Sequence, residues 1–177
     1  DIYDPSYNDM LRVAFTYEFK RGRMQHLVAL LSGRNFETRQ YEEVIAEDSF
    51  ARLKDAVMKY MNESNFKRFM MIIRSAGFIN VSMIGSQNAM NFAYALYLTL
   101  KDQGLSPGEI ERYVRRWYVL SVLTGRYSAS PESQFDWDIK QLDLQGSQEY
   151  LDSIIDSVLS PSYWDSVLPQ EMNTSVV

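Results

Sequence analysis

The chain has 177 residues, 46% of them hydrophobic, and a formal net charge of −5, which is typical of one globular domain or of two small domains that share a core. It has no cysteine and a single histidine, His26, which excludes disulfides, thiolate chemistry and any metal site that needs two imidazoles, so we expect no metal or other cofactor. The longest strongly apolar run, residues 89–100, is shorter than the roughly 18 residues of a membrane-spanning helix, and no signal sequence is recognisable. We therefore expect a cytoplasmic protein without a membrane partner.

The first 46 residues are expected to form a helical hairpin and a loop. Asp4-Pro5 is typical of an N-cap followed by proline at the first helical position, and this helix should run to about Phe19. Apolar residues three and four apart predict a second helix from Met24, with Gly33 at its C-terminal end. Residues 34–46 have no clean periodicity and fit either a loop or a short strand.

The remaining residues, 47–177, are expected to form the main bundle. Apolar spacing predicts a helix from Asp48, and Asn62 is the expected N-cap of the next helix, which Gly77 ends. Residues 81–86 should be a connector.

The helix expected at 87–102 is apolar on nearly all sides, so it should lie at the centre of the bundle. Ser106-Pro107-Gly108-Glu109 is a capping box that predicts a helix start at residue 107, and Gly125 should close that helix. Ser130-Pro131 should open a helix through about Leu142, and a last apolar stripe lies at 151–159.

These patterns predict an all-α fold, a compact bundle of about eight helices around the apolar helix at 87–102. No segment is a clear strand. We expect residues 1–177 to form a single helical domain. Because the chain begins with Asp1 rather than Met, we also expect it to be a piece of a longer multidomain protein.

Charge is unevenly distributed, and the helix at 109–126 is basic. Arg112, Arg115 and Arg116 lie on it, and the four-residue step from Arg112 to Arg116 places both on one face, where a phosphate of DNA could bridge them. Nearby glutamates on the same helix could instead pair with these arginines. Both interpretations stay open, phosphate or nucleic-acid contact and local pairing.

Arg126 and Tyr127 follow the glycine that closes this helix, and Asp136 and Asp138 lie in the next helix as carboxylate partners. One interpretation is a site in which Arg126 grips a phosphate or another ligand. The other is a structural clamp of Arg126, Tyr127, Asp136 and Asp138 that fixes the angle between two helices, which suits the planar, bidentate guanidinium.

Methionines are frequent in the middle third of the chain, namely Met58, Met61, Met70, Met71, Met83 and Met90. They predict an adaptable core filling or a surface for self-association, with a second copy of the chain as partner.

Three stretches carry a family resemblance: SAGFINVSMIGSQNAMNFAYALYL (75–98), VRRWYVLSVLTGRYSASPESQFDWDI (114–139) and SYWDSVLPQEMNTSVV (162–177). Together they resemble the helical middle region of the GmrSD-like restriction endonuclease family, bacterial proteins related to modification-dependent, phage-defence nucleases. In that family an N-terminal domain with an Asp-Gly-Gln-Gln-Arg motif is associated with nucleotide hydrolysis, and a C-terminal His-Asn-His domain with DNA cleavage. Neither motif occurs in this chain, so the resemblance implies no catalytic residue here.

The resemblance implies a non-catalytic helical linker that couples a nucleotide-hydrolysing domain to a nuclease, with other domains of its own parent chain as partners. The chain by itself is therefore not expected to be an enzyme. The alternatives are a nucleic-acid-binding module that uses the basic helix 109–126 and a self-association domain.

Overall fold

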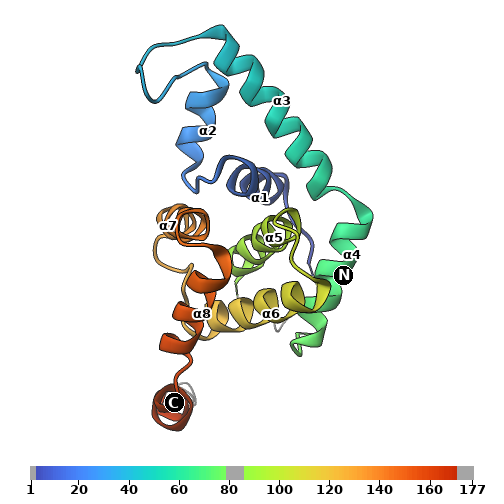
Figure 1. Ribbon diagram of the computed structural model, residues 1–177, viewed down its shortest axis with the longest axis vertical. Coiled ribbons are helices and arrows are strands. Elements are labelled where there is room, and N and C mark those ends of the chain that lie inside the picture. Colours follow the sequence, from blue (N-terminus) through green and yellow to red (C-terminus); the bar gives the residue numbers. More distant parts are fainter. Residues whose placement is uncertain (1–2, 79–85, 171–177) are drawn as a thin grey trace.

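The computed structural model describes residues 3–78 and 86–170, and within them the fold is all-α (Figure 1). Eight α-helices occur there: α1 (Tyr7–Phe19), α2 (Met24–Leu31), α3 (Glu43–Tyr60), α4 (Glu63–Ser75), α5 (Gln87–Asp102), α6 (Pro107–Leu123), α7 (Pro131–Leu144) and α8 (Ser147–Val158). A π-helix, η2 (Tyr163–Val167), follows them. The predicted all-α bundle is confirmed, and no described helix is long and apolar enough to cross a membrane.

Side-chain caps fix several of the helix starts that the sequence predicts. Ser106 and Glu109 form a reciprocal capping box with Pro107 in the first turn of α6. The Asn62 side chain accepts a hydrogen bond from the Asn65 amide, and Ser86 caps α5 in the same way. The predicted connector at 81–86 lies, apart from Ser86, outside the described residues.

The predicted start of the first helix at Asp4-Pro5 was wrong. Ser6 and Asp9 form a capping box, so α1 begins at Tyr7. Asp9 also accepts a 2.6 Å hydrogen bond from the buried Asn91 amide of α5, which holds this turn against the core. A capping box satisfies two free backbone amides at once, which outweighs the weaker proline signal upstream.

The start of α3 also differs from its prediction at Asp48, because the helix already begins at Glu43. The loop before it is closed by an isolated antiparallel bridge between Arg34 and Tyr41. Asn35 donates a 2.9 Å hydrogen bond to the Glu42 carboxylate. These contacts orient the chain at residue 42, so the helix can begin five residues early.

Helix α5 packs on α1 and α6 and also contacts α4 and α7. Figure 1 shows it between α1 and α6. All residues from Ala89 to Leu100 are buried, including the polar Asn91 and Thr99.

The turn between α1 and α2 lies directly on the start of α7. Gly22 donates a 2.9 Å hydrogen bond to the Asp136 carboxylate. A Cβ on Gly22 would lie 2.2 Å from the Asp136 backbone nitrogen and 2.5 Å from the Glu132 carbonyl oxygen. Only glycine allows so close an approach of the two backbones.

Candidate functional site

A buried polar cluster surrounds Asp138 of α7, whose side chain has no solvent-exposed surface. The Arg126 guanidinium donates two hydrogen bonds to its carboxylate, at 2.9 Å from Nε and 2.6 Å from Nη2. The hydroxyls of Tyr127 and Tyr150 each donate at 2.8 Å, and the Gln134 amide donates at 3.0 Å. Asp138 therefore joins the end of α6 to both α7 and α8.

Aromatic rings enclose this cluster. The Trp117 indole nitrogen donates a 3.0 Å hydrogen bond to the Tyr127 hydroxyl, and the Arg126 guanidinium lies 5.0 Å from the Trp117 ring centroid. Burial raises the pKa of Tyr127 well above its ordinary value, and Asp138 adds to this shift. Burial likewise raises the pKa of Tyr150, so both hydroxyls stay protonated and act as donors.

Asp136, which the sequence placed in the same clamp, is not part of it. Its carboxylate accepts hydrogen bonds from Lys140 at 2.6 Å and from the Gly22 amide. Residues two apart on an α-helix point to nearly opposite sides. Asp136 and Asp138 therefore act on different neighbours, and the clamp of the structure has Tyr150 as its further member.

The arginines of α6 do not converge on one point. Arg115 pairs with Glu111 at 3.6 Å and Arg116 with Asp156 at 3.3 Å. The Arg112 guanidinium lies 4.6 Å from the ring centroid of Tyr113. Arg126 is held in the buried cluster, so these four side chains form no common phosphate site in the structure.

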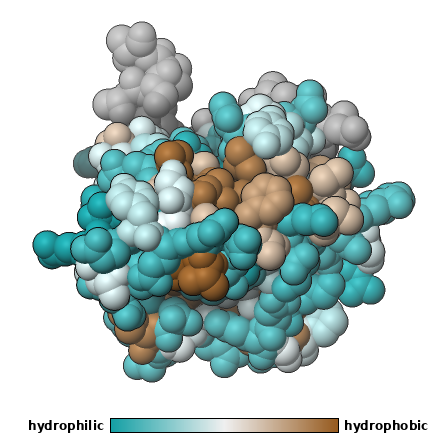
Figure 2. All heavy atoms as spheres, turned by 90° about the horizontal axis from the view of Figure 1, so that it is seen from above, coloured by the Kyte–Doolittle hydropathy of each residue, from teal (hydrophilic) through white to brown (hydrophobic). Residues whose placement is uncertain are grey.

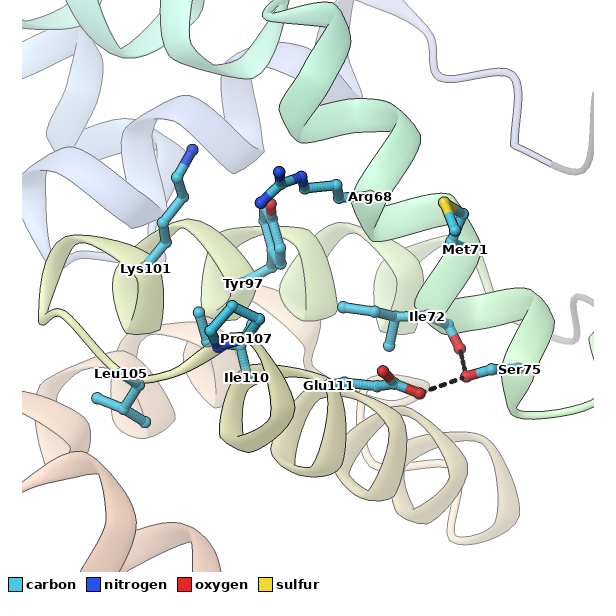
Figure 3. A pocket seen from close by; sticks show the side chains of 10 residues that line it. All are labelled: Arg68, Met71, Ile72, Ser75, Tyr97, Lys101, Leu105, Pro107, Ile110 and Glu111. Carbon is cyan, nitrogen blue, oxygen red and sulfur yellow. Dashed lines mark hydrogen bonds between the residues drawn. The ribbon is translucent and has the colours of Figure 1, made fainter.

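A groove of about 640 Å³ lies between α4, α5 and the start of α6 (Figure 3). Its apolar surface comes from Met71 and Ile72 of α4 together with Leu105, Pro107 and Ile110. This volume is within the usual range of small-molecule sites. No sequence pattern indicates this groove, since its residues come from three helices and the turn between α5 and α6.

Polar groups lie along the same groove, and most have partners. The Lys101 ammonium donates a 2.5 Å hydrogen bond to the Asn65 side chain. The Glu111 carboxylate accepts a 3.4 Å hydrogen bond from Ser75 and pairs with Arg115. Among the described residues, no group of three or more acidic or histidine side chains is placed to hold a metal ion.

Comparisons with models of protein families, with curated proteins and with solved structures found no match. The resemblance to the GmrSD-like family therefore stays a prediction. Its most specific part, the turn at 125–128 and the Ser130-Pro131 helix start, builds the Asp138 cluster. The other two stretches lie partly outside the described residues.

Proposed function

We propose that this chain is a non-catalytic helical linker domain of a GmrSD-like, modification-dependent restriction protein of bacterial phage defence. It would couple a nucleotide-hydrolysing domain to a His-Asn-His nuclease within one parent chain. The observation that carries the proposal is the Asp138 cluster, because the most distinctive residues of the resemblance are engaged there in holding helices together.

The cluster suits a domain that passes a movement from one neighbouring domain to another rather than one that catalyses a reaction. Its carboxylate is shared by side chains from the α6–α7 turn, α7 and α8. A buried polar network whose members are all satisfied fixes one arrangement of its helices. A rigid body of this kind passes a movement at one end to the other without losing it in internal flexing.

The test is to assay the purified chain for GTP hydrolysis and for cleavage of modified and unmodified DNA. We expect neither activity, and turnover by the chain alone would contradict the proposal. The gene around this segment should also encode an Asp-Gly-Gln-Gln-Arg motif upstream and a His-Asn-His motif downstream. In that longer protein, Asp138→Asn should lower nucleotide-dependent cleavage while isolated nucleotide hydrolysis continues.

Self-association is a second candidate function, favoured by the outer face of α3. Figure 2 looks onto the end of the molecule that carries α2 and the start of α3, where hydrophobic side chains gather among hydrophilic ones. Val44, Phe50 and Met58 of α3 and Met61, the residue that caps its C-terminal end, are 62–65% exposed. At about 100° per residue these four lie on one side of the helix. Such a stripe on a surface helix is typical of an interface.

The charges on this stripe are self-complementary. Glu47 and Lys54 are both exposed and lie on the same face. If two copies of α3 pack antiparallel about a two-fold axis between residues 50 and 51, Glu47 of each copy faces Lys54 of the other, and Phe50 faces Ala51. The partner that fits this face is therefore a second copy of the chain.

The nucleic-acid alternative has less support. Arg115 and Arg116 are engaged with carboxylates, and Arg126 is largely buried. The exposed pairs of Arg115 and Arg116 cost little to break, so the obstacle lies at Arg126, where a phosphate would have to displace the buried Asp138 carboxylate.

A further inference from the structure

The groove between α4, α5 and α6 contains one polar pair that has no other partner among the described residues. Tyr97 as a whole residue is 3% exposed and lines the groove. Its hydroxyl forms no hydrogen bond to another described residue. Arg68 lies beside it and acts on it electrostatically. In the view of Figure 3, the Arg68 guanidinium and the Tyr97 hydroxyl lie next to one another on the same side of the groove.

The other charges of the groove are already used. Lys101 is bonded to Asn65, and Glu111 to Ser75 and Arg115. The Tyr97 hydroxyl is not among the buried polar atoms that lack a partner, so it opens onto the groove, where it can bond to water or to a ligand. The Tyr97 hydroxyl and the Arg68 guanidinium therefore offer donors to a ligand rather than to the protein.

The pair favours an anion. Burial raises the pKa of Tyr97, although Arg68 opposes this, so the hydroxyl stays a neutral donor. A guanidinium presents two parallel N–H groups that match the two oxygens of a carboxylate. A tyrosine hydroxyl beside it supplies a third donor to the same group.

The remaining surface favours an apolar body. Ile72 projects into the groove from α4, and Pro107 and Ile110 face it from α6 (Figure 3). An aliphatic or aromatic chain on this surface loses its water contact, which favours binding in proportion to the buried apolar area. The groove thus joins a polar end to an apolar floor.

We propose that this groove binds a small amphipathic carboxylate, with the carboxylate on Arg68 and Tyr97 and the apolar body over Ile72, Pro107 and Ile110. Binding of such a ligand does not require the linker function proposed above. The site is a binding site only, and no bond is formed or broken in it.

The experiment is a titration of ¹⁵N-labelled chain with sodium decanoate and, separately, with 1-decanol, followed by amide chemical shifts. Decanoate should shift amides of residues 68–75, 97–101 and 105–111 saturably. The neutral alcohol should bind at least about tenfold more weakly, because it lacks the negative charge that strengthens hydrogen bonds from a guanidinium. Equal affinity for the alcohol, or no saturable shift at these residues, would overturn the proposal.

Three variants make the test specific. Arg68→Gln and Tyr97→Phe should each weaken decanoate binding by roughly tenfold while leaving decanol binding unchanged. Arg74→Gln is the matched control, since Arg74 is exposed on the same helix and does not line the groove. Arg68 is exposed, so its substitution should not disturb folding. An unchanged affinity in the folded Arg68→Gln variant would also overturn the proposal.

Discussion

At the scale of single residues, Asp138 shows how one buried charge organises its surroundings. A carboxylate removed from water is tolerated only when hydrogen bonds and an opposite charge replace the water. Here a bidentate arginine, two tyrosine hydroxyls and an amide do so. Removing any one of these partners would leave the buried Asp138 carboxylate with fewer hydrogen bonds.

We expect Asp138→Asn to lower the free energy of unfolding by about 3 kcal/mol, because it leaves the Arg126 cation in a buried site without its counter-charge. Urea denaturation measures this. The control is Asp156→Asn, which removes the exposed partner of Arg116 and should leave stability almost unchanged, since exposed pairs contribute little. Equal loss in both variants would show that burial of the pair does not matter.

Asp136 should contribute a pH-dependent part of the stability. Burial by itself raises the pKa of Asp136, but the hydrogen bonds from Lys140 and Gly22 outweigh it, so its pKa lies below the ordinary 3.8. A lowered folded-state pKa adds stability above the unfolded-state pKa, and this contribution is lost as pH falls through the folded value. Between pH 5 and pH 3 the wild type should therefore lose more unfolding free energy than Asp136→Asn. Parallel pH profiles of the two would refute this.

At the scale of elements, local signals explain what the sequence predicts well. The Ser106–Glu109 capping box and the Asn62 cap involve residues three apart, so their helix starts follow from sequence alone. The Ser6–Asp9 capping box is equally local, and the start of α1 was misplaced because the Asp4-Pro5 signal was preferred to it. The start of α3 was misplaced because it depends on the loop closed by the bridge between Arg34 and Tyr41. That bridge is set by loop geometry that a periodic pattern does not contain.

Among the contacts between elements, we expect the contact of Gly22 with α7 to be the least tolerant of substitution. Gly22→Ala would place a methyl group against the α7 backbone, and we expect a loss of about 3 kcal/mol from overpacking. Thermal unfolding followed by circular dichroism measures it. Gly108→Ala is the matched control, because a Cβ there meets nothing within 4 Å, and it should hold or slightly raise the melting temperature. A normal melting temperature for Gly22→Ala would mean that the turn can move away from α7.

At the scale of the whole molecule, apolar periodicity was sufficient to predict the all-α class and the helix order, because burial of one face is what makes short helices stable. The residues of the two candidate sites were harder to predict from the sequence. Arg126 and Asp138 are 12 residues apart and were found together, whereas Tyr150 comes from α8 and was missed. Arg68 and Tyr97 meet only through packing of α4 on α5, which no local pattern reveals.

Self-association through α3 predicts a particular pattern of charge variants. Wild-type chain should form dimers in sedimentation velocity as concentration rises. Glu47→Lys or Lys54→Glu alone should weaken the dimer, since each creates two like-charge contacts of about 0.5 kcal/mol across the two-fold axis. The double variant should restore it. A wild-type monomer at the highest concentration, or a double variant as weak as the single ones, would exclude this interface.

The hydrogen bond between Gly22 and Asp136 also bears on the order of events during synthesis, because the two residues are 114 positions apart. A ribosome releases the chain from its N-terminal end, at roughly 5–20 residues per second. The α1–α2 turn must therefore wait several seconds, until the α7 carboxylate has left the exit tunnel, before it can be locked in place. During that interval the first two helices are available to chaperones and proteases in a way that the finished protein does not permit.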